Sequence, residues 1–302
     1  MIALGGANGS STFGGQINDG PSGGKMSLEK DGSGTLTLTG RNTYSSDTTI
    51  NSGTLTIGGT GVLGNGSYDG SIVNYGVLQY SSSATQTLNG AINDYGAGGT
   101  LIKDGPGYLI LTGSNDYYGS TTVSGGTLAV NGWILNSSDL TVGSGGTLAG
   151  TGTISTSVTI NGGGLRPGNG PNDIGKLTVD NLTLANNPRL YFDLSATNLT
   201  DTVIVNGDLI LTGMTTNWFV FSATNTLTAG AYTLFHIGGS VVDLGGNTNF
   251  TNIAGQPNAT GYLWLDQGNN NLDLLIVIPE PGTGALVVGG LALMFLLRRR
   301  RR

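Results

Sequence analysis

Few side chains in this sequence could carry out acid–base or nucleophilic chemistry. The 302 residues include one histidine, His236, and no cysteine, and Glu29 is the only glutamate before position 279. Three aspartates lie close together in the sequence, at Asp193, Asp201 and Asp208. Enzymes that cleave polysaccharides need paired carboxylates, or a basic group beside acidic calcium ligands. Aspartate is also a common turn residue, so we interpret these three as turn residues and predict no catalytic residues.

A second group of residues could bind a ligand without catalysis. Aromatic rings can stack on sugars, and the rings considered for this role are Trp218, Tyr262 and Trp264. Packing in the core is the alternative for each of them. Oxygen ligands suit calcium, and one short stretch supplies several: Asp266, Asn269, Asn270 and Asp273. We interpret that stretch as a polar hairpin loop and predict no metal site, since the lack of cysteine also removes zinc–thiolate sites.

Two glycine-rich stretches match nucleotide-binding patterns only in part. Gly59–Gly64 fits GxGxxG, but no helix follows it and no acidic residue stands about 20 positions on. Gly170–Lys176 fits GxxxxGK, but Leu177 stands where a phosphate-binding loop needs Ser or Thr. The residues after Lys176 also read as a strand where that loop requires a helix. We therefore predict no nucleotide cofactor.

The charge balance argues against a nucleic-acid surface. The chain carries 12 basic and 18 acidic residues, for a net charge of −6. Five of the basic residues are the terminal Arg298–Arg302, and without them the net charge is −11, from 7 basic and 18 acidic residues. A nucleic-acid-binding protein needs a basic patch or stripe. We therefore expect no nucleic-acid partner.

These residues sit in a chain that is built on an internal repeat. The stretch Leu28–Leu55 recurs at Leu101–Leu128, at an offset of 73 residues without a gap, and 16 of the 28 positions are identical. A repeat of this length indicates an array of stacked units. Within each copy, apolar residues alternate with threonine, and Gly-, Asn- and Ser-rich turns separate the short segments. This alternation is typical of strands with one buried face.

The repeat favours a parallel β-helix over a β-sandwich. A sandwich of two independent sheets does not explain a gapless repeat, whereas stacked coils of about 20 residues do. The sequence therefore predicts an all-β, right-handed parallel β-helix, in which 73 residues make three or four coils. We expect Leu36 and Leu109 to occupy equivalent inward positions on stacked coils. We expect Asn42 and Asn115 to bond neighbouring backbone at a turn, where Tyr44 and Tyr117 cover the edge of the core.

The repeated pattern, KxGxGxLxLxGxNxYxxxTTxxxGTL, resembles the autotransporter-associated β-strand repeat. The resemblance is strong over 28–57 and 101–130. This family is found in large exported bacterial proteins with β-helical passenger regions, so the resemblance implies a surface or secreted structure. It carries no catalytic residues to this chain. We assign 1–189 to the β-helix and 190–278, which is richer in aromatic residues, to terminal coils or a β cap.

The last residues differ in character from everything before them. Pro279-Glu280-Pro281 precedes the apolar run 284–297, which five arginines follow. As a helix, 14 residues span about 21 Å, short of the ~30 Å hydrocarbon core of a membrane. Arginine stems can reach the interface, so we predict a single short transmembrane helix. Arginines remain on the cytoplasmic side, which places the preceding chain outside that membrane.

This three-part tail, 279–302, resembles the PEP-CTERM sorting signal. The resemblance implies recognition of Pro279, Glu280 and Pro281 by an exosortase-type membrane protease, with Arg298, Arg299, Arg300, Arg301 and Arg302 setting the orientation. It further implies an inner-membrane intermediate in a Gram-negative-type bacterium, followed by release to the cell surface or medium. Because export needs a signal peptide and Met1 does not begin one, we expect the array to start upstream of Met1.

Together these features predict a non-enzymatic, exported structural or adhesive protein. Its expected partners are the sorting protease, the inner membrane and exopolysaccharide or the cell envelope. A carbohydrate-binding module is the alternative, and a polysaccharide-degrading β-helix enzyme is a third possibility that the scarcity of Glu, His, Cys and Lys disfavours.

Overall fold

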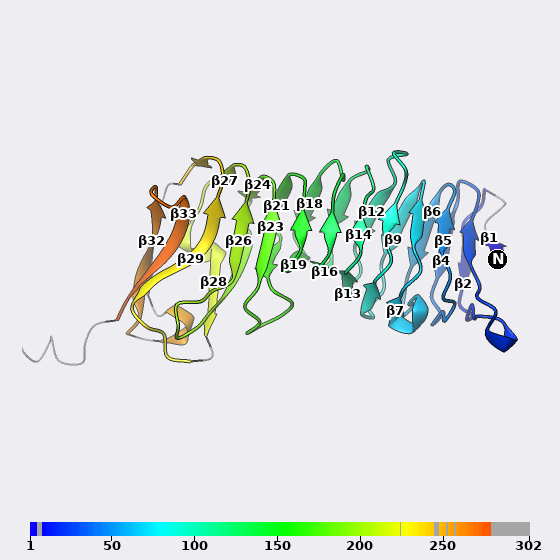
Figure 1. Cartoon of the computed structure of the whole chain (residues 1–302), viewed down its shortest axis with the longest axis horizontal. Helices are drawn as coiled ribbons and strands as arrows, with labels where there is room; N and C mark the ends of the chain where they lie inside the picture. Colours follow the sequence, from blue (N-terminus) through cyan, green and yellow to red (C-terminus); the bar gives the residue numbers. More distant parts are fainter. Residues whose placement is uncertain (5–7, 224, 245–247, 252, 257, 279–302) are drawn as a thin grey trace, which may run out of the picture.

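The protein is a rod of stacked β-coils, with the first residues at one end and the C-terminal strands at the other (Figure 1). The structure is a computed structural model that describes residues 1–4, 8–223, 225–244, 248–251, 253–256 and 258–278. Each coil contributes short strands that pair in parallel with the same strands of the coils before and after it. The predicted all-β parallel solenoid is therefore confirmed.

The strands form three ladders, which we call faces one, two and three. Face one begins as five strands and continues, after a parallel bridge between Asn93 and Asp116, in a second sheet. In chain order its strands are β1 (Ile2–Leu4), β3 (Leu28–Lys30), β5 (Thr48–Ile50), β8 (Ile72–Asn74), β11 (Ile92–Asn93), β14 (Ser114–Asn115), β17 (Trp133–Ile134), β20 (Thr153–Ile154), β23 (Lys176–Val179), β26 (Thr202–Val205) and β29 (Gly230–Ile237).

Face two is one continuous eleven-stranded sheet. Its strands are β2 (Ser11–Phe13), β4 (Thr35–Leu38), β6 (Thr54–Ile57), β9 (Val77–Tyr80), β12 (Thr100–Lys103), β15 (Thr121–Val123), β18 (Leu140–Gly143), β21 (Val158–Asn161), β24 (Leu182–Ala185), β27 (Leu209–Leu211) and β30 (Val241–Val242).

Face three is an eight-stranded sheet. Its strands are β7 (Ser67–Tyr68), β10 (Gln86–Leu88), β13 (Tyr108–Leu111), β16 (Gly126–Val130), β19 (Gly146–Gly150), β22 (Gly164–Pro167), β25 (Arg189–Leu194) and β28 (Phe219–Ala223). Many of the coil strands have only two to four residues. The chain must turn a corner after each face, and this limits the length of each strand.

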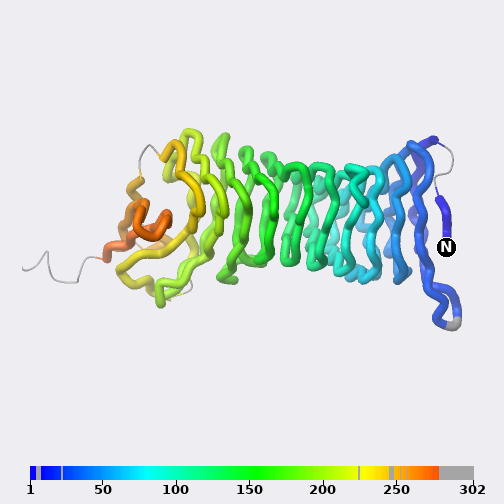
Figure 2. The backbone as a smooth tube through the Cα atoms, turned by 45° about the horizontal axis from the view of Figure 1, so that its top comes forward, coloured from blue at the N-terminus to red at the C-terminus, as the bar shows by residue number. Residues whose placement is uncertain are grey.

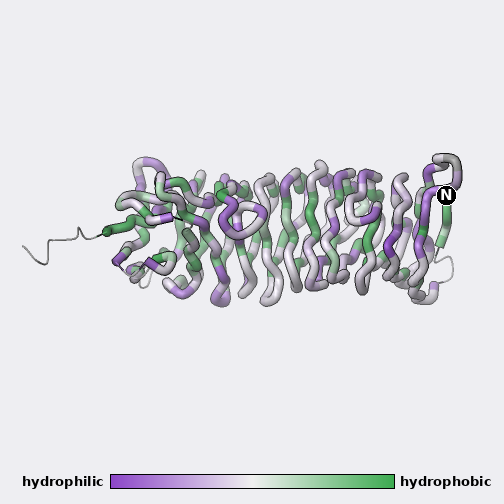
Figure 3. Tube along the Cα trace, turned by 90° about the horizontal axis from the view of Figure 1, so that it is seen from below, coloured by the Kyte–Doolittle hydropathy of each residue, from purple (hydrophilic) through white to green (hydrophobic). Residues whose placement is uncertain are grey.

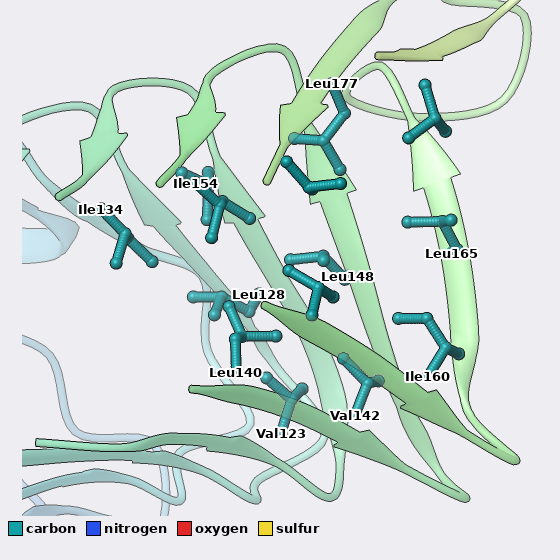
Figure 4. Packing of buried hydrophobic residues seen from close by; sticks show 14 of the residues in the cluster. Val123, Leu128, Ile134, Leu140, Val142, Leu148, Ile154, Ile160, Leu165 and Leu177 are labelled. Carbon is teal, nitrogen blue, oxygen red and sulfur yellow. The ribbon is translucent and has the colours of Figure 1, made fainter. Parts of the chain in front are cut away.

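The core is the narrow space between the three faces. Aliphatic side chains stack in register from coil to coil, as Leu55, Leu78 and Leu101 do along face two. Side chains from all three faces meet in the interior, where Leu128, Leu148 and Leu165 of face three point toward Val123 and Val142 of face two, among other residues (Figure 4). Along the coils, hydrophobic and hydrophilic residues alternate (Figure 3). The alternation arises because successive side chains of a strand point to opposite faces.

The two copies of the repeat do not stack on each other as expected. Leu36 and Leu109 both point inward, with 3% and 1% of their surface exposed. However, Leu36 lies in β4 on face two, whereas Leu109 lies in β13 on face three. Three coils lead along face one from β3 to β11, and the second copy starts one face later, at β12. Each copy wraps round more than one full coil: the first begins with β3 on face one and ends with β6 on face two, and the second begins with β12 on face two and ends with β16 on face three.

The C-terminal end closes with antiparallel strands. β29 pairs with β33 (Asn271–Val277), which pairs with β32 (Thr260–Asp266), and β31 (Asn249–Thr251) completes the sheet. The coils at this end are wider than those in the middle of the rod (Figure 2). Aromatic rings fill the extra space, with Phe192 contacting Phe219, Phe221 and Phe235. Short 3-10 turns complete the description: η1 (Pro21–Gly23), η2 (Gly64–Gly66), η3 (Thr216–Trp218) and η4 (Ile253–Gly255).

In the described part of the chain, no helix is both long and apolar enough to cross a membrane. The predicted transmembrane run 284–297, the motif Pro279-Glu280-Pro281 and the arginines 298–302 lie outside the described residues.

Candidate functional site

The lysines of the repeat are buried and bond the corners of two coils. The Lys30 ammonium donates to the carbonyls of Gly32 and Ser52, at 2.7 Å and 3.1 Å. In the second copy, Lys103 donates to the corresponding carbonyls, those of Gly105 and Gly125. Burial lowers the pKa of Lys103 to about 8. Each lysine therefore joins successive corners on the inside of the rod and offers no charge to a ligand.

The asparagines of the repeat each bridge three coils. Asn115 Oδ1 accepts from the Ile92 amide at 3.0 Å, and its Nδ2 donates to the carbonyls of Gly113 and Trp133, at 3.1 Å and 2.9 Å. Asn42 makes the same three kinds of bond, to the Ile17 amide and to the carbonyls of Gly40 and Val62. The expectation that these side chains bond neighbouring backbone is confirmed.

The tyrosines of the repeat lie inside the core. Tyr44 OH lies 2.7 Å from Thr48 Oγ1, and Tyr117 OH lies 2.6 Å from Thr121 Oγ1. Both rings are fully buried, so they fill the interior at a corner and do not merely cover its edge. Burial raises the pKa of both phenols, which stay protonated. The polar residues that recur most clearly in the sequence are thus used within the rod.

Two of the three aspartates considered for catalysis, Asp201 and Asp208, accept hydrogen bonds from backbone amides. Asp201 is fully buried, and its two carboxylate oxygens accept from the amides of Gly175 and Asp193, at 2.7 Å and 2.9 Å. Burial raises the pKa of Asp201 to about 7. Asp208 is exposed and accepts from the Ser240 amide at 2.8 Å. Asp201 and Asp208 therefore hold backbone amides near turns, as interpreted from the sequence.

His236 lies beside an amide. Its Nδ1 is 2.8 Å from Asn271 Oδ1 on the exposed face of the β29–β33 pair. A serine hydrolase places a carboxylate at this position of its histidine, so the contact does not build that kind of catalytic group.

The aromatic residues considered for sugar stacking fall into two groups. Trp218 is buried, with 1% of its surface exposed, and its Nε1 donates to Asn187 Oδ1 at 3.3 Å. It is a core residue. Tyr262 and Trp264 are 42% and 43% exposed, and both lie on the outer side of β32. Trp264 faces Asp273 across the strand pair. The rings of Tyr262 and Trp264 are therefore both exposed on the same side of β32.

The stretch considered for calcium forms the β32–β33 hairpin. Asp266 caps its turn, with Oδ1 accepting from the Gly268 amide at 3.0 Å and Oδ2 accepting from Asn269 Nδ2 at 2.6 Å. Asn270 has a positive φ of 54°, and Asp273 is buried on β33. Within the ranges that the structure describes, no group of three His, Cys, Asp or Glu side chains could hold a metal ion.

The two glycine-rich stretches are corners of coils. Gly59–Gly64 joins β6 to the turn before β7, and no helix of the kind a dinucleotide requires follows it. Gly170–Lys176 leads into β23, the strand predicted for these residues.

A hollow on the outer side of face three was not foreseen from the sequence. It measures about 130 Å³, and its lining includes Tyr108, Thr127, Thr147, Arg166 and Tyr191. The Arg166 guanidinium lies 4.5 Å from the centre of the Tyr191 ring. The sequence offered one signal for this hollow: Arg166 stands at an outward strand position in a chain with few cations. The aromatic neighbours of Arg166 could not be predicted without knowing how the strands of successive coils pair.

Comparison with known proteins agrees with this architecture. The passenger-associated-transport-repeat model matches residues 28–57 and 101–130. Over 177 residues, 56% of this chain, the sequence is 36% identical to the adhesin BmaC autotransporter of Brucella suis biovar 1 (strain 1330), of which the match covers 5%. It is 40% identical over 87 residues, 29% of this chain, to an extracellular serine protease of Serratia marcescens, of which the match covers 8%.

These findings define a class of protein. The chain folds as a parallel β-solenoid and carries two repeats that are similar to passenger-associated-transport repeats. The two matched repeats have the boundaries predicted from the sequence. The matched segments span a small part of each relative, so they account for the coils alone.

Proposed function

We propose that the protein is a non-enzymatic structural or adhesive component that is exported to the cell surface or the medium. The observation that carries this proposal is the use of the repeated Lys, Asn and Tyr side chains within the rod, where they bond coil to coil. Because the recurring polar side chains bond one coil to the next, the chain forms a long, rigid rod that provides a surface. The similarity to a segment of an adhesin autotransporter supports the same function.

The match to an extracellular serine protease does not lead us to propose protease activity. It covers 8% of that protein, and the sole histidine here pairs with an amide. The buried Asp201 is occupied by two backbone amides. These contacts support a structural role for His236 and Asp201.

We further propose that the tail, 279–302, sorts the protein at the inner membrane. Support comes from its sequence alone: Pro279-Glu280-Pro281, a 14-residue apolar run at 284–297, and five arginines. Arginines resist crossing against the membrane potential, so they halt translocation. Proline has no amide proton and disfavours helix at the residue before it, so the motif stays extended. It is then available to an exosortase-type protease at the membrane surface.

Mass spectrometry of the mature protein tests this proposal. A signal peptide is added and the chain is produced in a bacterium that has the sorting protease. The expected C-terminus lies near Pro279–Pro281, and Glu280→Ala should leave the whole tail in the membrane fraction. A matched control, Glu29→Ala, should be processed normally. Equal processing of the Glu280→Ala and unaltered chains would refute sorting and leave the tail as an anchor only.

A second candidate function is carbohydrate binding through β32. Tyr262 and Trp264 favour it because both rings are exposed side by side on one strand surface. Loss of saccharide binding on Trp264→Ala, with binding kept on Thr260→Ala of the same strand surface, would support this function. Equal binding by both variants would exclude it.

A further inference from the structure

The hollow on face three lies where the outward residues of neighbouring strands come together. Tyr108 of β13 is in register with Thr127 of β16, which is in register with Thr147 of β19. The next strand, β22, places Gly164 beside Thr147. Strands in a sheet are about 4.8 Å apart, so this row runs along the rod axis. A tyrosine at one end is followed by two hydroxyls and a glycine.

Gly164 leaves space beside Thr147, one of the residues that line the hollow. A Cβ at this position would lie 2.7 Å from Thr147 Oγ1 and 3.2 Å from Thr147 Cγ2. Any other residue would therefore press on the threonine and cover its hydroxyl. Gly164 has no positive φ that requires glycine, so space, and not backbone conformation, is the physical reason for glycine here.

Arg166 supplies a positive charge to the same hollow. It stands on β22 beyond Gly164, and its guanidinium packs on the Tyr191 ring at 4.5 Å. None of the described residues that line the hollow is an aspartate or a glutamate. Stacking on an aromatic ring fixes the plane of the guanidinium, and its fork of donors matches a carboxylate in two parallel bonds. The hollow thus presents a cation in a chain of net negative charge.

We propose that this hollow binds a carboxylate-bearing sugar residue of an acidic polysaccharide. Arg166 receives the carboxylate, and Thr127 and Thr147 meet ring hydroxyls. The Tyr108 ring, 42% exposed, packs on the apolar side of the sugar. Ligand sites commonly combine aromatic walls with a few polar groups in this way. The inference rests on the proposed surface function, which it deepens by naming a ligand class.

Other ligands fit the hollow less well. A neutral sugar would cover the half-buried guanidinium without providing a counter-charge. A small inorganic anion would not use Tyr108. A nucleic acid requires a basic patch or stripe, and the described lining of the hollow supplies one cation, Arg166.

Isothermal titration of the full chain, kept soluble with detergent, tests the proposal. The probes are the trisaccharides of galacturonate, glucuronate and mannuronate, with the methyl-esterified galacturonate trisaccharide as the uncharged analogue and triglutamate as a non-sugar anion. We expect at least one uronate to bind, the ester and triglutamate to bind about tenfold more weakly or not at all, and binding to weaken as salt rises. Failure of all three uronates, or equal binding of triglutamate, would overturn the proposal.

Variants locate the binding. Arg166→Gln should weaken uronate binding by about tenfold, and Tyr108→Ala should weaken it several-fold because it removes the ring. Arg41→Gln is the charge-matched control, because Arg41 is exposed and bonds Asn65 elsewhere on the rod. Binding by Arg166→Gln equal to that of the unaltered chain would overturn the proposal. So would loss of binding on Trp264→Ala alone, which would place the sugar on β32.

The variant Arg166→Lys distinguishes a loss of binding from a defect in folding. It keeps the charge but not the fork, so we expect binding between that of the unaltered chain and that of Arg166→Gln, with unchanged thermal unfolding. If Arg166→Lys bound as tightly as the unaltered chain, two-bond recognition of a carboxylate would be refuted. Surface display is measured separately on whole cells, so loss of uronate binding with normal display would reject this inference alone.

Discussion

At the scale of single residues, the side chains that could do chemistry are mostly used to hold coils together. Asn115 bonds three coils, Lys103 bonds two corners and Asp201 receives two amides. The sequence predicted from residue types alone that Asn115 bonds neighbouring backbone. It could not place Arg166 beside Tyr191, because their contact depends on how two distant strands pair.

Asn115→Ala should destabilise the rod strongly. The substitution removes the partners of the Ile92 amide and the Trp133 carbonyl, and one of the two donors to the Gly113 carbonyl. Unsatisfied buried groups cost about 1–3 kcal/mol each, and partial relaxation leads us to expect about 3 kcal/mol in total. A lowered urea midpoint would show the loss. The control Asn136→Ala removes an exposed side-chain bond to Asp116 and should leave the midpoint nearly unchanged; equal midpoints for the two variants would contradict this role.

Asp201 should make the stability depend on pH. Burial, together with the nearby Asp193 and Asp173, raises the pKa of its carboxyl from 3.8 to about 7. Because the pKa is higher in the folded state than in the unfolded state, the folded state holds more protons between these values. The free energy of unfolding should therefore fall as pH rises from about 4 to about 7.

Asp201→Asn separates this effect from the hydrogen bonds. Its overall stability will change, but urea titrations between pH 4 and 7 should show a weaker pH dependence than the unaltered chain. Asp208→Asn, at an exposed position, should keep the original dependence. If Asp201→Asn keeps the same slope, another group causes it.

At the scale of strands and corners, the sequence predicted which side chains point inward better than it predicted which face each copy of the repeat occupies. Alternation predicted that Leu109 points inward, and it does. The recurring Gly53 and Gly126 both have a positive φ, and a Cβ on either would lie within 2.4 Å of a carbonyl of the preceding coil. Corners of this kind explain why the repeat retains glycine. Which face each copy occupies could not be predicted, because the pattern is alike on all three.

Leu109→Asp tests the inward orientation of β13. A carboxylate placed in the interior without a partner costs about 3–5 kcal/mol, so thermal and urea unfolding should both shift strongly. Tyr108→Asp places the same charge at the exposed neighbouring position and should shift them little. Similar effects of the two substitutions would contradict the alternation.

At the scale of the whole molecule, a repeat displaced by one face still builds a continuous rod. Each copy of the motif runs over more than one coil, and it begins on face one in the first copy and on face two in the second. Gapless repetition was therefore enough to predict a solenoid. Gapless repetition was not enough to predict whether the two copies of the repeat lie on the same faces, because the lengths of the coils between the copies determine this. The antiparallel end also escaped detailed prediction, since its strand pairing links β29 to β33 across an intervening 33 residues.

Export of this rod to the outside of the cell is the central claim, and the lack of cysteine allows a direct measurement. Ser138→Cys introduces a thiol at an exposed corner, whereas Ile134→Cys, in the same coil, introduces a buried one. Intact cells of the producing bacterium are treated with a large polyethylene glycol maleimide that cannot cross the outer membrane. We expect Ser138→Cys to be labelled on intact cells or in the medium, and Ile134→Cys only after unfolding. Labelling of Ser138→Cys only after the cells are broken would contradict the account.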